Sequence, residues 1–192
     1  TSINIPDALT SIGNNAFERC SLLENVTISS QSALTSIEGA AFMSCSSLTS
    51  IILPDGVTEI GSNAFTGCSS LTSINIPNGV TSIIRAFYGC SSLTSIILPD
   101  SVTEIGNNTF YGCSSLASIT IPGGVTSIGI GAFYDCTSLA GVTCKATTPP
   151  TLGENAFYNI SPTAELLVHS GYMDVYVNSE WSSYFALIGE QD

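Results

Sequence analysis

One motif recurs about every 23 residues, and this repetition constrains the fold more than any other feature of the chain. It reads C-S-S-L-T-S-I-x-[IL]-P-x-x-V-T-x-I-G-x-x-A-F. It can be traced from Thr1 to Leu139 with one two-residue insertion and one single-residue deletion. A chain built from one repeated unit forms a solenoid, in which each unit packs only on its neighbours. The sequence therefore predicts an elongated array of stacked coils.

Each repeat carries an apolar pattern that predicts one short strand. From the leucine that follows each cysteine, the sequence reads L-x-x-[IV]-x-[IL], as in Leu48, Ile51 and Leu53. This is the core pattern of a leucine-rich repeat, whose alternating apolar residues point inward from the strand. A proline ends most of these strands because it cannot donate to a strand ladder, and turn residues follow it.

A second apolar pair follows the turn, such as Val57 and Ile60 in the third repeat. The G-x-x-A-F segment is then expected to form a single helical or 3-10 turn that brings its alanine and phenylalanine into the core. Each coil thus contributes roughly seven inward side chains, which only stacking on neighbouring coils can bury. The phenylalanines of the motif are Phe17, Phe42, Phe65, Phe87, Phe110 and Phe133, and the cysteines are Cys20, Cys45, Cys68, Cys90, Cys113 and Cys136.

The predicted fold is a leucine-rich-repeat solenoid: a right-handed coil with a parallel β-sheet on one face. Short strands and single helical or 3-10 turns make the other faces. Residues 1–163 are expected to form about seven coils, the first of them truncated, and residues 164–192 a non-repetitive C-terminal cap rich in aromatic residues. In this cap we expect a strand near Glu165–His169 and a short helix from about Tyr172 to Val177.

Three departures from the repeat carry further expectations. The second repeat has two extra residues within Ser29–Leu34, which should bulge outward, whereas the fourth is one residue short around Arg85. Thr1 lies inside a repeat, so the simplest interpretation is a fragment or processed form of a longer array. The uncapped first coil is then a predicted association surface on an otherwise monomeric protein.

The composition excludes several classes of partner. The chain carries 15 acidic and 3 basic residues, and its net charge of −12 argues against binding nucleic acid. It has no apolar run long enough for membrane insertion. Serine, threonine and asparagine supply most of the surface, which suits hydrogen bonding to glycans or protein loops but also suits an inert secreted shell.

The cysteines are interpreted as core residues. Six of the seven occupy one column of the coil, and Cys144 replaces a strand leucine. Buried free cysteine behaves as a small apolar residue. Disulfides between stacked neighbours are disfavoured because their Cβ vectors run parallel, and the absence of any C-x2-C pair disfavours zinc.

Catalytic chemistry finds little support in the sequence. The only histidine is His169, in the expected cap, and no nucleophile motif, phosphate-binding loop or metal motif accompanies it. Glu59 and Glu104 share a repeat position and should lie about 10 Å apart, farther than a glycosidase pair usually does. Asp7, Asp55 and Asp100 form an acidic edge with Asn78, where weak calcium binding competes with an ordinary role as turn residues. We expect no enzyme activity, no cofactor and no metal site.

The surface best suited to binding is the outward side of the predicted sheet. Ile52 and Ile97 bracket Asn75 there, and apolar anchors within a polar rim are typical of interface centres. The alternative is that a β-branched residue simply suits a strand. The candidate binding face is the outward column Asn4, Thr27, Ile52, Asn75, Ile97, Thr120 and Thr143.

The repeat L-T-S-I-x-I-P-x-x-V-T-x-I-G-x-x-A-F-x-x-C-S-S resembles the BspA-like, or Treponema pallidum-type, leucine-rich repeats over essentially the whole chain. The tail, with Tyr176, Trp181, Tyr184 and Phe185, resembles the end module of the same proteins. The resemblance implies a secreted or surface-anchored protein of a host-associated bacterium that binds matrix or plasma proteins such as fibronectin or fibrinogen. It transfers no functional residue, since the shared positions are those expected in the core.

Together these observations favour a non-catalytic, extracellular binding or adhesion module. It would recognise host matrix proteins, mucin or glycans through the sheet face. A structural spacer within a longer cell-surface protein is the alternative, and a hydrolase is the remote one.

Overall fold

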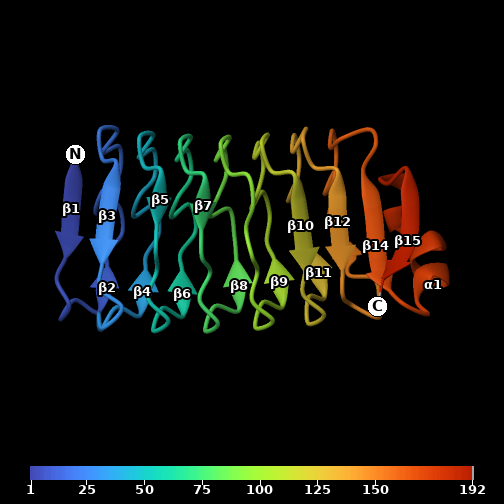
Figure 1. Cartoon of the computed structure of the whole chain (residues 1–192), viewed down its shortest axis with the longest axis horizontal. Coiled ribbons are helices and arrows are strands. Elements are labelled where there is room, and N and C mark those ends of the chain that lie inside the picture. Colours follow the sequence, from blue (N-terminus) through green and yellow to red (C-terminus); the bar gives the residue numbers. More distant parts are fainter. Residues whose placement is uncertain (192) are drawn as a thin grey trace.

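The computed structural model describes residues 1–191 as a straight stack of coils, with the chain advancing by one coil per repeat from the N-terminal to the C-terminal end (Figure 1). Most coils pass through two rows of strands, and every strand pair is parallel because each coil returns the chain in the same direction. In the repeat that contains Ile97, the first row is represented only by the parallel bridge between Asn75 and Ile97. The first row consists of β1 (Ser2–Ile5), β3 (Asn25–Ile28), β5 (Ser50–Ile51), β7 (Ser73–Ile74), β10 (Ser118–Ile121), β12 (Gly141–Cys144), β14 (Glu165–His169) and β15 (Leu187–Gln191).

The second row lies on another side of the coil. It consists of β2 (Ser11–Ile12), β4 (Ser36–Ile37), β6 (Glu59–Ile60), β8 (Ser82–Ile83), β9 (Glu104–Ile105), β11 (Ser127–Ile128) and β13 (Thr151–Leu152). The register places equivalent repeat positions side by side, for example Ile51 beside Ile74. Coils are numbered here by repeat, so that coil 3 covers residues 48–70, coil 4 covers 71–92 and coil 5 covers 93–115.

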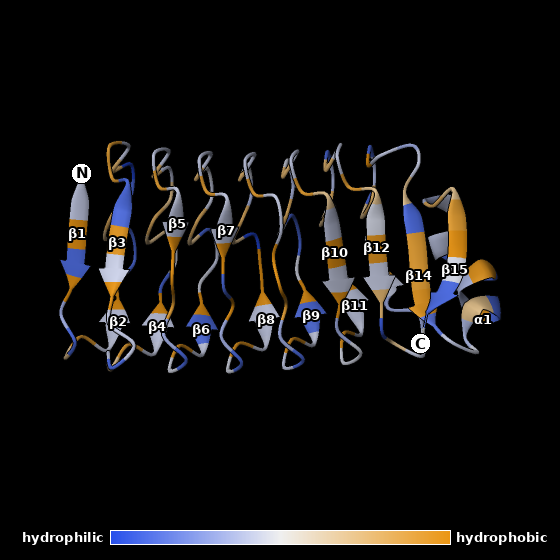
Figure 2. Ribbon diagram, in the orientation of Figure 1, coloured by the Kyte–Doolittle hydropathy of each residue, from blue (hydrophilic) through white to orange (hydrophobic). Residues whose placement is uncertain are grey.

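The apolar core lies between the rows and runs through the whole stack. Apolar and polar residues alternate along the strands, as β1 and β10 illustrate (Figure 2). Most of the expected inward positions are buried, which confirms the predicted core pattern, whereas Ile3, Phe17 and Ile28 near the N-terminal end are only partly buried. In coil 3 the buried positions are Leu48, Ile51, Leu53, Val57, Ile60, Phe65 and Cys68.

The phenylalanines form a continuous stack through the core. Neighbouring rings from Phe17 to Phe157 lie with their centroids between 4.9 and 5.7 Å apart, and their planes are nearly parallel. Each added ring is therefore covered on both faces by rings of the adjacent coils, which is why a single coil could not bury it.

The cysteines form a second column beside the rings, and all are free thiols. The Cys68 thiol donates to the carbonyl oxygen of Phe42 at 3.2 Å, and the thiols of Cys45, Cys90, Cys113 and Cys136 make the equivalent bond. The core interpretation is confirmed for six cysteines and is wrong for Cys20, which is exposed. Cys20 differs because the described residues hold no earlier coil that would cover it.

The G-x-x-A-F segments are chains of tight turns, each closed by a hydrogen bond between residues three apart, which is the bond of the expected 3-10 turn. Within coil 3 this turn buries Ala64 and Phe65 completely, as expected. In coil 3 the Ala64 amide donates to Gly61 O at 3.2 Å, but Asn63 then adopts a left-handed conformation with φ 61°. Alternate amides of the segment donate to a carbonyl oxygen of the next coil. Phe42 N–H, for example, donates to Ala64 O at 2.8 Å. An amide that bonds to the next coil cannot continue a helix, so each segment stays a series of turns.

The insertion and the deletion are each absorbed locally. In the second repeat Ser30 and Gln31 are exposed, as expected for a bulge, while Leu34 is fully buried at the position of Val57. In coil 4 Arg85 is left-handed (φ 52°), and its amide donates to the hydroxyl of the buried Thr109 at 3.3 Å. Thr109 replaces the usual alanine of the repeat, and its hydroxyl satisfies a backbone amide at the shortened coil.

The C-terminal segment closes the core. β14 occupies Glu165–His169 as predicted, and the helix α1 (Met173–Val177) begins one residue later than predicted. A 3-10 helix η1 (Glu180–Ser183) follows. The strand β15, which pairs with β14, was not predicted because L-I-G-E-Q lacks an alternating apolar pattern.

Aromatic residues of this segment cover the last ring of the stack. Trp181 packs on Phe157 with 5.3 Å between ring centroids, and its indole N–H donates to Pro150 O at 2.8 Å. The Tyr176 hydroxyl donates to Ala146 O at 2.7 Å. Both side chains are fully buried with their polar atoms paired, as a rigid end plate requires.

Candidate binding surface

The first row presents the predicted column of side chains outward. Asn4 lies beside Thr27, Asn75 beside Ile97, and Thr120 beside Thr143. Six members of the column are exposed, and Thr143 is half-buried. The structure therefore brings the candidate residues together on one face, as the alternation of the strands required.

Two isoleucines stand out on this polar face. Ile97 is 82% exposed and Ile52 is 74% exposed, which makes them the two most exposed large apolar side chains among residues 1–191. They belong to coils 5 and 3, so one coil separates them. A shallow depression of about 750 Å³ lies between them.

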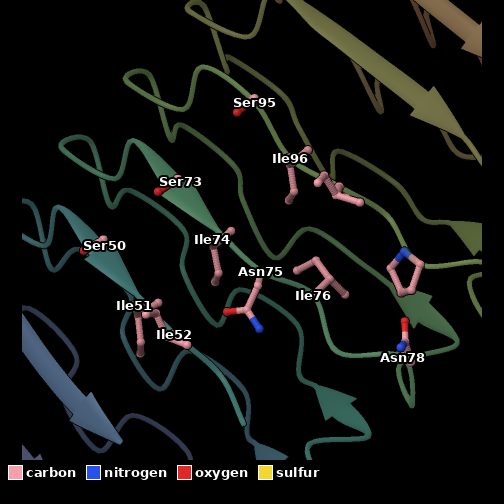
Figure 3. A pocket seen from close by; sticks show the side chains of 12 residues that line it. Ser50, Ile51, Ile52, Ser73, Ile74, Asn75, Ile76, Asn78, Ser95 and Ile96 are labelled. Atoms are coloured by element: carbon pink, nitrogen blue, oxygen red, sulfur yellow. The ribbon is translucent and has the colours of Figure 1, made fainter. Parts of the chain in front are cut away.

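The lining of this depression has exposed isoleucines on two sides, Asn75 between them and polar side chains at its edges. Ser50, Ser73 and Ser95 form one edge, and Asn78 lies at the opposite edge (Figure 3). All four of these side chains are exposed. Exposed apolar side chains within hydroxyl and amide groups are the arrangement expected of a protein-binding patch.

Asn75, in the centre of the depression, is a structural residue and is not free to bind. Its amide nitrogen donates to Leu53 O at 2.8 Å, and its amide oxygen accepts from Leu53 N–H at 2.9 Å. The side chain leans toward coil 3 to make these bonds (Figure 3). It takes the place of a strand partner for Leu53, a role that the sequence pattern alone did not reveal.

Carboxylates lie at the turn end of the face. Asp55 and Asp100 occupy in coils 3 and 5 the repeat position that Asn78 occupies in coil 4, and both are exposed. The ion pairs found among residues 1–191 join Glu24 to the amino terminus and Arg19 to Glu18. Neither pair involves the two aspartates, so their charges remain available to a partner.

The groups considered for chemistry lie apart from one another. His169 ends β14 with its Nδ1 3.1 Å from Ser170 O, whereas Glu59 and Glu104 belong to the second row, on either side of Ser82 in the stack. Within the described part of the chain, no three metal-ligating side chains converge, the expected acidic edge included. No helix of residues 1–191 has both the length and the apolar character needed to cross a bilayer.

A ladder of partly exposed tyrosines runs outside the core and was missed at the sequence level. Tyr88, Tyr111, Tyr134 and Tyr158 stack with 4.8 to 4.9 Å between neighbouring ring centroids. The Arg85 guanidinium lies 4.9 Å from the centroid of Tyr88. The recurring F-Y dipeptide was the available signal. One such residue per coil at a fixed repeat position must form a column.

The first coil also exposes apolar surface. Leu22 is 72% exposed, and Phe17, Leu22 and Leu23 line a second depression with the chain start. This is the surface for which association was predicted, and it stays a prediction.

Stacked parallel coils with this core define a leucine-rich-repeat solenoid. The BspA type leucine-rich repeat family model matches residues 1–85 and 84–177 with six copies, so the chain belongs to this family, as the repeat motif had suggested. No curated protein matches the chain.

Several solved bacterial structures are similar. The leucine-rich repeat protein of T. pallidum is 31% identical, with 84% of this chain and 78% of that chain covered and a TM-score of 0.75. A leucine-rich cell surface protein of Faecalibacterium prausnitzii A2-165 is 32% identical, with 98% of this chain and 56% of that chain covered and a TM-score of 0.73. A leucine-rich repeat protein of Eubacterium ventriosum is 26% identical, with 84% and 43% covered and a TM-score of 0.72. The chain thus spans about half the length of the last two.

Proposed function

We propose that this protein is a non-catalytic, extracellular binding module that recognises a host matrix protein, mucin or a glycan through its first-row sheet face. The observation that carries the proposal is the pair Ile52 and Ile97, the most exposed large apolar side chains described, on either side of a depression in a polar face. Membership of a leucine-rich-repeat family, whose repeats generally mediate protein binding, supports a binding role.

The extracellular location is supported by similarity to the F. prausnitzii protein, which is a cell surface protein. The surface of this chain is consistent with such a location, since serine, threonine and asparagine dominate it and its net charge of −12 favours solubility. We propose that the repeats present their long face to a partner outside the cell and that the C-terminal segment protects the end of the core.

The test is binding of the purified chain to immobilised fibronectin, fibrinogen, collagens, mucin and a glycan array at two salt concentrations. We expect saturable binding to at least one of these. The double substitution Ile52→Lys and Ile97→Lys should abolish it, because two charges would replace the exposed apolar side chains of the face.

The matched control is the double substitution Thr27→Lys and Thr120→Lys, which adds the same charge in the same column outside the depression. Binding that both double variants retain would refute this face as the site. Absence of any partner would favour the structural spacer, and turnover of a glycan or peptide would overturn the non-catalytic assignment.

A further inference from the structure

Coils 3 and 5 carry the same hexapeptide on the first-row face, and coil 4 between them does not. Residues 50–55 and 95–100 both read S-I-I-L-P-D, whereas residues 73–78 read S-I-N-I-P-N. The outward isoleucine and the aspartate of the turn are therefore duplicated on the two coils that flank the depression. Coil 4 lacks both features, so the duplicated groups lie on either side of a single coil.

The gap between the two isoleucines has the width of one planar ring. Parallel strands are about 4.8 Å apart, so a group above coil 4 lies about 5 Å from the outward columns of coils 3 and 5. The tyrosine ladder shows what fits this spacing, because the Tyr111 ring lies 4.8 Å from the ring centroids of both Tyr88 and Tyr134. A ring above coil 4 would pack against Ile52 and Ile97 in the same way.

Asn75 keeps this gap open. Its amide is bonded to both backbone groups of Leu53, and these bonds hold the side chain toward coil 3. An apolar residue at this position would stand upright and fill the gap, as the neighbouring isoleucines show by their exposure. The depression is thus an open slot, with Asn75 as its floor.

The negative charge at one end of the slot indicates which charge the partner carries. Asp55 and Asp100 lie three residues after Ile52 and Ile97, about 10 Å farther along the strand direction. Neither aspartate has an ion pair in the described chain, and none of the three basic residues belongs to these hexapeptides. Two carboxylates that flank the neutral Asn78 favour a positively charged group at this end.

We infer that the slot between Ile52 and Ile97 takes an aromatic side chain of a partner protein, from a segment that places a lysine or arginine between Asp55 and Asp100. This inference rests on the proposed function and specifies its ligand. The aromatic ring is sandwiched between two aliphatic side chains, and the cation of the partner lies near two carboxylates at the turn.

The test uses nuclear magnetic resonance with a defined probe, the capped peptide Gly-Ser-Trp-Gly-Ser-Lys-Gly-Ser. A ring stacked between the isoleucines must move the Ile52 and Ile97 methyl resonances upfield through its ring current. The same peptide with leucine in place of tryptophan should produce no upfield shift. A peptide with glutamate in place of lysine should bind at least threefold more weakly, and the difference should shrink at high salt.

The substitution Asn75→Ile separates this inference from the proposed function. It adds a third isoleucine, so a general apolar face would bind a protein partner as well as before or better. If the site is a slot, the new isoleucine side chain fills it, and we expect the affinity for the tryptophan peptide to fall at least tenfold. Thr120→Ile is the matched control, because it adds the same side chain in the same column outside the slot.

Because Asn75→Ile also removes two hydrogen bonds, its fold is checked by circular dichroism, and the peptide substitutions test the slot on the unchanged protein. Absence of upfield methyl shifts at millimolar peptide would overturn the inference, as would equal shifts with the leucine peptide. If the Ile52 and Ile97 lysine variant loses a matrix partner while the tryptophan peptide leaves the methyls unmoved, the slot is refuted and the binding face stands.

Discussion

At the scale of single residues, the cysteine column shows how a polar group is kept inside an apolar core. Each of five buried thiols donates to a phenylalanine carbonyl of the preceding coil, as Cys90 does to Phe65 O at 3.2 Å. Burial raises the pKa of Cys45 to about 11 and the pKa of both Cys90 and Cys136 to about 12, because the thiolate would lose its hydration. These thiols are therefore neutral and unreactive in the folded chain.

The raised thiol pKa values predict that stability declines in alkaline solution. An unfolded thiol loses its proton near its ordinary pKa of 9.0, whereas Cys90 in the fold keeps its proton up to about pH 12. The buried thiols therefore make their full contribution to the free energy of unfolding below pH 9. As the pH rises from 9 toward 12, this free energy falls by about 1.4 kcal/mol for each thiol and each pH unit. Urea unfolding under reducing conditions at about pH 8 and about pH 10.5 measures this decline.

The control is Cys90→Ala, which removes one titrating thiol. The free energy of unfolding of this variant should fall with pH less steeply, by about 1.4 kcal/mol per pH unit. An unchanged slope in this variant would contradict the assignment to the buried thiols. Cys20, which is exposed, should be the thiol that reacts first with an alkylating reagent in the folded protein.

At the scale of elements, the C-terminal segment ends the stack by supplying the neighbour that the last coil would otherwise lack. β14 and β15 extend the first row in register, and η1 places Trp181 against Phe157. The helix α1 contributes Tyr176, whose ring meets that of Trp181 edge-on with 5.4 Å between centroids. The segment therefore extends the first row of strands and also covers the last phenylalanine ring of the stack with Trp181.

Trp181→Ala should lower the free energy of unfolding by about 3–5 kcal/mol, because it leaves a cavity over the last ring of the stack. Trp181→Phe keeps an aromatic ring there but removes the donor to Pro150 O, and should cost about 1 kcal/mol from that hydrogen bond alone. Guanidinium unfolding measures both. A loss below about 1 kcal/mol for the alanine variant would show that the end plate is not held by this residue.

At the scale of the whole molecule, stability arises from contacts between adjacent coils. Every strand pair and every ring pair of the stack joins a coil to the next one, so the chain behaves as a one-dimensional array. A core side chain is therefore covered by the coil before it and the coil after it. The loss of unfolding free energy on substitution depends on whether both of these coils cover that position.

Phe87→Ala should therefore destabilise the chain more than Phe17→Ala. Phe87 is completely buried, with ring centroids 5.7 Å away on each side, and its removal should cost about 3–5 kcal/mol. Phe17 is only partly buried and stacks on Phe42 alone. Equal losses of unfolding free energy for the two variants, measured by denaturant unfolding, would contradict the view that stability arises from contacts between adjacent coils.

Much of this fold could be predicted from the sequence because the repeat fixes each residue's environment by position. The inward pattern of Leu48, Ile51 and Leu53, the outward exposure of Ile52 and the strand at Glu165–His169 all follow from a period of two within strands and a fixed repeat between coils. The family followed from the same motif, and the structural similarities agree with it.

Other features were decided only by the tertiary structure, and they share one physical cause. The Asn75 amide satisfies the backbone of Leu53, the Thr109 hydroxyl satisfies the amide of Arg85, and alternate amides of G-x-x-A-F donate to the next coil. Each depends on a hydrogen bond between two coils, whose partner lies more than twenty residues away and is absent from the local pattern. The sequence by itself determined which residues face inward and how the coils stack. Only the assembled stack decided which outward side chains are tied to a neighbouring coil and which remain free for a partner.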